Sequence, residues 1–142
     1  DGLNPVVALP LGEEGLRALR EELRMPGPDR LRYVADAFRA GLSLHDVQRT
    51  SRIDPWFLAQ IEDLVRDEQR VAGEGEQRLD AQRLRALKRK GFADSRLAGL
   101  CGTSEQAIRE RRHGLGIRPV FKRVDTCAAE FASSTAYLYS TY

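Results

Sequence analysis

The sequence is poor in the residues that build metal and redox sites. Among 142 residues it has two cysteines, Cys101 and Cys127, and two histidines, His45 and His113. These four residues show no metal-binding spacing, and the cysteines lie too far apart to form a local motif. We therefore expect no metal site and no catalytic thiol, and interpret both cysteines as packed or idle thiols in a reducing cytoplasm.

The sequence also lacks an excess of charge and a long hydrophobic run. Its 23 basic and 21 acidic residues leave a net charge of +2. This balance is not the electrostatic footprint of a dedicated nucleic-acid binder, although the pI of about 8.7 is on the basic side. No apolar run approaches the roughly 18 residues of a membrane helix, and no signal peptide opens the chain. We expect neither nucleic acid nor membrane as a partner. Because the chain starts at Asp1 rather than methionine, we interpret it as a piece of a longer protein.

The sequence does contain an internal repeat. Residues 41–59 (GLSLHDVQRTSRIDPWFLA) align without a gap with residues 91–109, at an offset of 50 residues. The positions that recur are apolar and helix-capping ones rather than a set of base-reading side chains. The paired positions are Val34 and Leu84, Leu42 and Phe92, Val47 and Leu97, Asp54 and Ser104, and Leu58 and Ile108. The pattern indicates a duplicated helical unit.

Hydrophobic periodicity and breakers predict an all-α fold, an irregular array of long and short helices. We expect an extended entry segment at 1–12, a helical domain at 13–119, and an extended exit segment at 120–142. The helical domain contains two related hairpin units at about 29–72 and 79–116. The predicted helices cover 13–24, a stretch from Asp29 that ends at Gly41, 43–50, 54–71, about 80–90, 94–100 and 104–113, and a short strand is expected at 121–124.

The same patterns predict helix caps and a core. The predicted N-caps are Asp29, Ser43 (with Asp46 as a capping box), Asp54, and either Thr103 or Ser104. The residues expected on buried faces are Leu16, Leu19, Leu23, Leu31, Val34, Ala35, Phe38, Phe57, Leu58, Ile61, Leu64, Val65, Leu84, Leu87, Phe92, Leu97 and Ile108. The residues expected on the outer face of the longest helix are Glu62, Asp63, Asp67 and Glu68.

Residues that carry chemistry are few. No glycine-rich phosphate loop is present, Cys127 has no histidine nearby in sequence, and Asp125 and Glu130 would point to opposite faces of an extended segment. We therefore predict no catalytic, cofactor-binding or metal-binding residues. Residues 88–90 (KRK) fit either a solvated helix end, which we favour, or a phosphate-binding cluster.

A small helix-turn-helix DNA-binding regulator is the alternative function. Arg109, Arg111 and Arg112 are of the residue types that contact phosphates and guanine edges. Glu105 and Glu110 interrupt this basic helix, and the equivalent helix of the first unit is acidic. We therefore rank this alternative second.

Several longer segments of the sequence are distinctive: residues 35–41 (ADAFRAG), 53–61 (IDPWFLAQI), 87–94 (LKRKGFAD), 122–131 (KRVDTCAAEF) and 139–142 (YSTY). In order and in spacing, these segments resemble the large chain of glutamine-dependent carbamoyl phosphate synthetase. The resemblance covers nearly the whole chain, and it departs from the family's pattern mainly at residues 25–28 and 73–77.

The resemblance implies the connecting, or oligomerisation, domain of that large chain. In the family this helical segment joins two ATP-grasp synthetase units of a cytoplasmic ligase of arginine and pyrimidine biosynthesis. The implied partners are the flanking synthetase units, other large chains, and the small glutaminase chain. The implied cofactors of the parent enzyme are ATP, Mg²⁺ (or Mn²⁺) and K⁺, with their residues in the flanking units and none in this chain.

Overall fold

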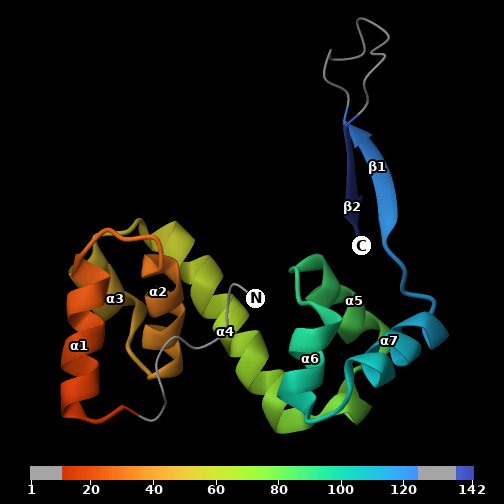
Figure 1. Cartoon of the computed structure of the whole chain (residues 1–142), viewed down its shortest axis with the longest axis horizontal. Helices are drawn as coiled ribbons and strands as arrows, with labels where there is room; N and C mark the ends of the chain where they lie inside the picture. The colour runs from red at the N-terminus through yellow and green to blue at the C-terminus, as the bar shows by residue number, and fades with distance from the viewer. Residues whose placement is uncertain (1–10, 125–136) are drawn as a thin grey trace, which may run out of the picture. The chain divides into compact units, whose positions relative to one another are not determined.

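The described part of the chain is predominantly helical, as predicted (Figure 1). The computed structural model describes residues 11–124 and 137–142. The chain divides into two compact units, Asp1–Arg70 (unit 1) and Val71–Tyr142 (unit 2), and each is described by itself. In chain order the elements are α1 (Glu13–Arg24), α2 (Arg30–Arg39), α3 (Leu44–Ser51), α4 (Pro55–Glu74), a 3₁₀ turn (Glu76–Arg78), α5 (Ala81–Arg89), α6 (Asp94–Cys101), α7 (Glu105–Gly114), β1 (Val120–Val124) and β2 (Tyr137–Thr141).

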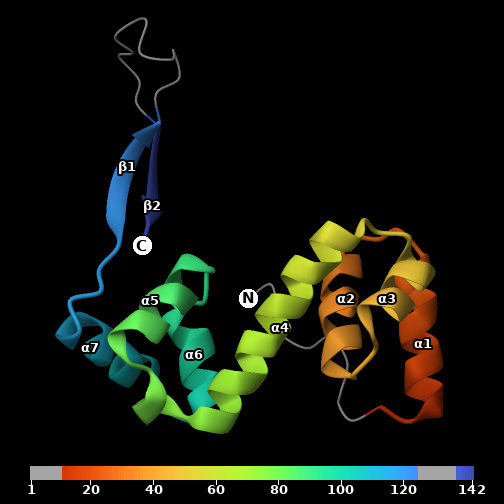
Figure 2. The same ribbon diagram turned by 180° about the vertical axis from the view of Figure 1, so that it is seen from behind.

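In unit 1, helix α1 packs against α2 and α3, as Figure 2 shows from behind. Leu19 and Leu23 lie four residues apart on one face of α1 and are fully buried. The start of α4 completes this core with Leu58 and Val65. The buried core residues are Leu19, Leu23, Val34, Ala35, Ala37, Phe38, Val47, Leu58 and Val65.

Local hydrogen bonds define the turn between α2 and α3. Gly41 has a φ of 84° and ends α2 in the left-handed conformation that glycine favours. The Ser43 hydroxyl oxygen accepts a hydrogen bond from the Asp46 N–H at 3.1 Å, and the hydroxyl donates to Asp46 Oδ2 at 2.7 Å. The predicted cap at Ser43 is therefore confirmed, but the capping box is only half formed, because the Asp46 carboxylate accepts from the Ser43 hydroxyl and not from the Ser43 backbone N–H. The hydrogen bond from Ser43 is the main reason that the pKa of Asp46 lies below its usual value.

The other predicted caps have mixed outcomes. Asp54 caps α4, because its Oδ1 accepts from the Trp56 N–H at 2.8 Å. At the start of α7 the cap is Ser104 rather than Thr103. Asp29 precedes α2 but its side chain accepts no capping hydrogen bond. That prediction was wrong, because the Asp29 carboxylate lies instead in an exposed ion pair with Arg32 at 3.4 Å.

Unit 2 repeats the helix spacing of unit 1. Helices α3 and α6 both have eight residues and start at positions 44 and 94 (94 − 44 = 50), and α4 and α7 start at positions 55 and 105 (105 − 55 = 50). Gly91, with a φ of 94°, ends α5 as Gly41 ends α2. The buried apolar residues of unit 2 are Val71, Leu79, Leu84, Leu87, Phe92, Leu97, Ala98, Ile108 and Ile117. The predicted burial of Phe92, Leu97 and Ile108 is confirmed.

Replacing Arg52 with glycine is expected to stabilise unit 1. Arg52 caps α3 at a φ of 59°, and Gly102 occupies the equivalent place after α6 at 67°. Holding a residue with a Cβ atom in the left-handed conformation costs about 1–2 kcal/mol of folding free energy, which glycine avoids. Part of this gain in stability is lost again, because glycine raises the conformational entropy of the unfolded chain. The free energy of unfolding, measured in urea, should rise by up to about 1 kcal/mol. The reciprocal Gly102→Ala variant should lose a similar amount, and a destabilised Arg52→Gly variant would contradict the argument.

Two predicted core residues are exposed instead. Phe57 is 58% exposed and Leu31 is 60% exposed, while Ile61 and Leu64 are half-buried. The apolar stripe was read correctly as helical, but α2 and α4 carry more apolar surface than the other helices of unit 1 cover. This excess surface lines a pocket described below.

The predicted outer acidic face of α4 was also wrong in part. Asp67 and Glu68 are buried, at 7% and 4% exposure, whereas Glu62 and Asp63 are half-buried. Periodicity could not reveal this because Glu68 is held by a basic residue of α2, Arg39, which lies 29 positions earlier.

The exit segment forms a β-hairpin rather than the single short strand that the sequence predicted. Strands β1 and β2 pair antiparallel, with Val120 opposite Thr141 and Val124 opposite Tyr137. The predicted strand at 121–124 is therefore confirmed and extended by one residue. Its partner strand was missed because the residues between the two strands carry no recognisable tight-turn motif.

Candidate interaction surface

A buried ion cluster lies at the centre of unit 2. The carboxylate of Asp94, at the start of α6, accepts hydrogen bonds from Lys88 Nζ (2.8 Å) and from Arg112 Nη2 (2.9 Å). The two cations also donate to backbone carbonyls: Lys88 to Phe92 (2.6 Å) and Arg112 to Ile117 (3.0 Å). All three side chains are below 10% exposure, so the cluster links α5, α6 and α7 inside the unit.

This cluster corrects the interpretation of residues 88–90 at Lys88, whereas Arg89 and Lys90 are exposed at the end of α5, as the favoured interpretation predicted. Lys88 is buried and paired, so it is neither a solvated residue nor a free phosphate ligand. Burial by itself would raise the pKa of Asp94, but the hydrogen bonds and charges of Arg112 and Lys88 outweigh it and lower that pKa. The carboxylate is therefore held ionised as a structural group.

Tyr142 connects the hairpin to this cluster. Its ring lies 5.2 Å from Lys88 Nζ and 5.7 Å from the Arg112 guanidinium carbon, within the range of cation–π attraction. Arg89 Nε donates to the Tyr142 backbone oxygen at 3.0 Å. The residue that follows β2 is therefore held on the helices of unit 2 by contacts with three basic side chains.

Unit 1 has an ion cluster of its own. Arg39 donates to Asp36 Oδ1 at 2.6 Å and to Glu68 Oε2 at 2.9 Å and 3.0 Å. The side chains of all three residues are at most 8% exposed. The cluster ties α2 to the middle of α4 and explains why Glu68 is inside the molecule.

The three arginines behind the DNA-binding alternative are held by other residues of unit 2. Arg112 belongs to the buried cluster, and Arg111 donates to the backbone oxygens of Leu79 (2.7 Å) and Gln77 (3.1 Å). Arg109 pairs with Glu105 on the surface of α7. These contacts hold the arginines within the domain, and nothing in the fold supports the alternative.

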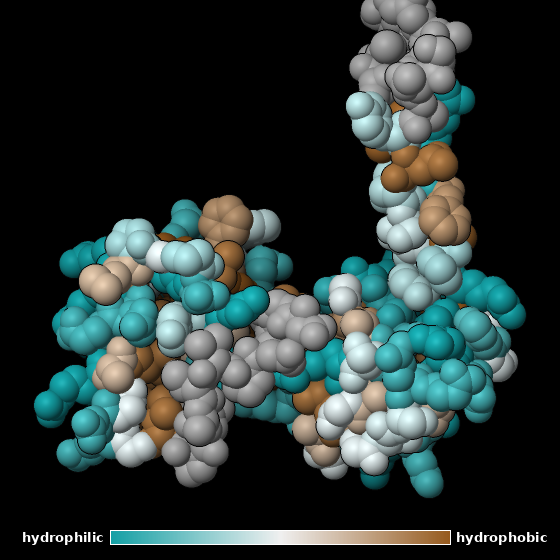
Figure 3. All heavy atoms as spheres, viewed as in Figure 1, coloured by the Kyte–Doolittle hydropathy of each residue, from teal (hydrophilic) through white to brown (hydrophobic). Residues whose placement is uncertain are grey.

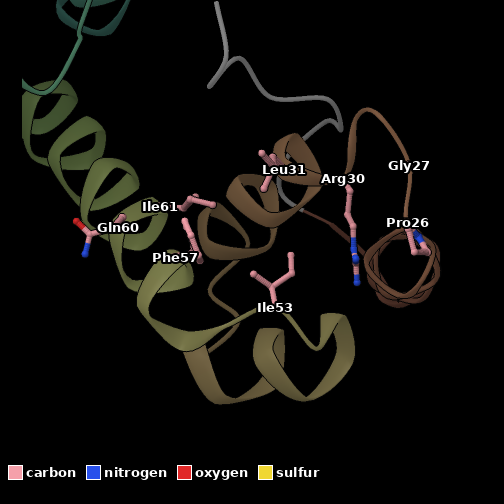
Figure 4. Close-up of a pocket in the computed structure, with 8 residues that line it drawn as sticks. All are labelled: Pro26, Gly27, Arg30, Leu31, Ile53, Phe57, Gln60 and Ile61. Atoms are coloured by element: carbon pink, nitrogen blue, oxygen red, sulfur yellow. The ribbon is translucent and has the colours of Figure 1, made fainter. Parts of the chain in front are cut away.

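An apolar recess that could receive another molecule lies in unit 1. It has a volume of about 490 Å³. In Figure 4, Leu31 from α2 lies close to Phe57 and Ile61 from α4, with Ile53 beside them. The lining residues are Pro26, Gly27, Arg30, Leu31, Ile53, Phe57, Gln60 and Ile61.

The charged residue in this lining, Arg30, already donates its hydrogen bonds to backbone carbonyls. Arg30 Nε donates to the Leu23 carbonyl at 3.0 Å, and its Nη2 donates to the Ser51 carbonyl. These bonds join the ends of α1 and α3, whose last carbonyls lack helical partners. Arg30 is therefore a structural brace, and the pocket is suited to an apolar side chain rather than to an anion.

Exposed apolar side chains extend the recess into a larger surface. Trp56 is 63% exposed and its ring meets the Phe57 ring edge-on, with centroids 5.0 Å apart. Met25, next to the lining residue Pro26, is 65% exposed. We call Met25, Leu31, Trp56 and Phe57, together with the pocket, the apolar patch. Such patches on a folded domain mark contact surfaces.

The hairpin of unit 2 carries a second set of exposed apolar side chains. Figure 3 shows brown, hydrophobic side chains open to solvent along its strands. Phe121 is 74% exposed, Tyr137 69% and Leu138 66%. A two-stranded hairpin is only marginally stable in water without a covering surface.

Cys101 carries a free thiol in the described part of the chain. Cys101 is half-buried, and its thiol pKa is raised by burial and by Glu76, so the nucleophilic thiolate is disfavoured. No cluster of potential metal ligands occurs within residues 11–124 and 137–142. In the same part of the chain, every helix is too short or too polar to cross a bilayer. Asp125, Cys127 and Glu130 lie outside the described residues.

These features define a helical interaction domain, in which buried charges are paired with one another and several large apolar side chains lie on the surface. Residues 5–116 match the model of the family described as carbamoyl-phosphate synthetase large chain, oligomerisation domain. The chain belongs to this family, as the resemblance implied, and the DNA-binding alternative finds no support.

Individual relatives agree with this assignment. The chain is 61% identical over 142 residues to a carbamoyl phosphate synthase large chain of Xanthomonas campestris pv. campestris, with 99% of this chain covered. It is 52% identical over 141 residues to that of Pseudomonas syringae pv. tomato, again with 99% covered. It is 58% identical over 124 residues, 87% of the chain, to that of Neisseria meningitidis serogroup B. The chain spans only 12–13% of the length of these relatives.

Proposed function

We propose that this chain is a non-catalytic connecting and oligomerisation domain within the large chain of a glutamine-hydrolysing carbamoyl phosphate synthetase. It joins the two ATP-grasp synthetase units of an ATP-dependent ligase of arginine and pyrimidine biosynthesis. Its partners are those flanking units and other large chains, and the small glutaminase chain belongs to the same enzyme. The family match and the identities of 52–61% to large chains support this proposal.

The proposed organisation follows from the repeat. Residues 1–12 enter the domain, 13–119 form its helical part with repeat units at about 29–72 and 79–116, and 120–142 lead into the next synthetase unit. The matching helix starts at an offset of 50 residues support a duplication. The enzyme is cytoplasmic in this proposal.

The cofactors of the proposed enzyme belong to other parts of the large chain. ATP, Mg²⁺ (or Mn²⁺) and K⁺ serve the synthetase units, and no residue of this chain is assigned to catalysis, cofactors or metal. In keeping with this, two basic residues of unit 2, Lys88 and Arg112, are buried and paired with Asp94.

The observation that best supports the connecting role is the hairpin. Its exposed Phe121, Tyr137 and Leu138 side chains would leave apolar surface in water unless a neighbouring domain covers them. Hydrogen exchange measured by mass spectrometry tests this directly, on the 142-residue chain and on the intact large chain. The amides of β1 and β2 should exchange faster in the 142-residue chain, because an uncovered hairpin opens readily.

The buried part of unit 2 provides the internal control. Amides around Leu97 and Ile108 lie in the core and should exchange slowly in both proteins. Equal exchange of the β1 and β2 amides in the two proteins would mean that the hairpin is an uncovered linker, and the connecting role proposed for it would be refuted.

A further inference from the structure

The apolar patch of unit 1 has no function in the fold described so far. It consists of Met25, Leu31, Trp56 and Phe57 around the pocket, and each of these four side chains is more than half exposed. We propose that this patch is a permanent docking surface for the synthetase unit that precedes this domain in the large chain. The inference rests on the proposed function and adds to it the surface and the identity of the occupant.

The composition of the patch favours a permanent cover over a reversible contact. Permanent interfaces resemble a domain core cut in half, whereas reversible ones keep a polar character. Here a tryptophan and a phenylalanine stand beside an apolar pocket, and Arg30, the charged residue in its lining, is turned to the carbonyls of Leu23 and Ser51. Left uncovered, such a surface would promote aggregation.

The covalent arrangement favours the preceding synthetase unit as the occupant. The relatives are about eight times as long as this chain, so most of the polypeptide lies outside it. The match to the family's domain begins at residue 5, and a fully extended chain of the six residues from there to Leu11 spans at most about 22 Å. In the proposed large chain, the unit that precedes this domain is thus joined to unit 1 by a short tether, at a high effective concentration, whereas the unit that follows is joined to the chain at the end of unit 2.

The geometry of the patch specifies the chemistry of its occupant. The recess of about 490 Å³ between Leu31, Ile53, Phe57 and Ile61 accepts a large aliphatic or aromatic side chain. Trp56 stands next to it and offers a flat apolar face with an indole N–H at its edge. The matching surface therefore presents one inserted apolar residue and an acceptor oxygen within reach of the indole.

Hydroxyl-radical footprinting with mass spectrometry tests the proposal through Met25, Trp56 and Phe57. In the 142-residue chain these side chains should react freely at every protein concentration. In the intact large chain their reactivity should be lost, down to the level of the buried Phe38 in the same protein. Trp56 is the single tryptophan of this chain, so its fluorescence in the 142-residue protein gives an independent reading of exposure.

A substitution on α2 tests whether contact at the patch itself, and not a general change of surface charge, protects Trp56. Leu31→Glu places a carboxylate at the pocket, and in the large chain it should restore the reactivity of Trp56. The matched control is Arg32→Glu, an adjacent charge change at an exposed ion pair outside the pocket lining, which should leave Trp56 protected. Both positions are exposed, so we expect both variants to fold. An unchanged circular dichroism spectrum of each 142-residue variant would verify this.

Each outcome decides the matter. If Trp56 stays reactive in the large chain, the patch is not covered and the inference is wrong. If Trp56 instead becomes protected in the 142-residue chain as concentration rises, in step with dimer mass in sedimentation, the occupant is a second copy and the inference is also wrong. Either result could occur together with slow hydrogen exchange of the β1 and β2 amides in the large chain. The connecting role proposed above is therefore decided by the exchange experiment and not by this one.

Discussion

Replacing Asp94 with asparagine is expected to lower the free energy of unfolding of unit 2 by about 3–5 kcal/mol, since removing one member of a buried ion cluster leaves the others uncompensated. Lys88 and Arg112 would both remain at less than 10% exposure without their counter-charge. The ring of Tyr142 stacks on the same two cations, so the anchoring of β2 should weaken as well.

Chemical unfolding followed by circular dichroism measures this loss, and Trp56 fluorescence reports unit 1 in the same sample. The matched control is Glu105→Gln, which removes a carboxylate from an exposed pair on α7 and should cost no more than about 1 kcal/mol. An Asp94→Asn variant as stable as the control would show that the cluster does not stabilise the unit.

Acid provides a second check on Asp94. Its pKa is lowered in the folded chain from the usual value near 3.8. A lowered pKa contributes stability that is fully present above that usual value and is lost as the pH falls through the folded pKa. The difference in stability between the wild type and Asp94→Asn should therefore be constant near neutral pH and shrink below about pH 3.8.

Truncating Leu58 to alanine is expected to destabilise unit 1 by about 2–5 kcal/mol, through lost burial and the cavity left behind. Leu58 lies on α4 and is fully buried in the core of unit 1. Its neighbour in sequence, Phe57, is 58% exposed and supplies the matched control. Phe57→Ala removes more atoms yet should cost less than about 1 kcal/mol, because little of its ring is buried by folding of unit 1.

Guanidinium unfolding monitored at Trp56 distinguishes the two variants, since this tryptophan lies in unit 1. The Trp56 ring contacts the Phe57 ring, so the Phe57→Ala substitution changes the tryptophan emission directly. The fluorescence of the folded and unfolded states must therefore be measured separately for this variant. Equal losses from both variants would contradict the burial described here.

Much of the fold could be predicted because local chemistry determines it. Gly41, the Ser43 cap and the Asp54-Pro55 start each fix a helix end with atoms only a few residues apart. The apolar positions that recur at an offset of 50 residues, such as Leu58 and Ile108, are buried in both units.

The errors arose where distant residues decide the environment. Glu68 is buried because Arg39 reaches it from another helix, and Lys88 is buried because Asp94 and Arg112 surround it. Helical periodicity identifies an apolar stripe, but it does not show how much of that stripe the rest of the unit covers. For this reason Phe57 was predicted to be buried although it is exposed. The surface proposed here for docking is the part of that stripe left over.

The pairing of Val120 with Thr141 has a geometric consequence for the path of the polypeptide. The chain leaves the helices of unit 2 at β1 and returns to the same place at the end of β2, where Tyr142 rests on Lys88 and Arg112. Residues 120–141 therefore add almost no net displacement to the path of the polypeptide. Whatever follows residue 142 starts beside residue 120, at a point set by the helices. Lengthening or shortening both arms of the hairpin by paired residues would change how far it projects, but not the distance bridged between successive domains.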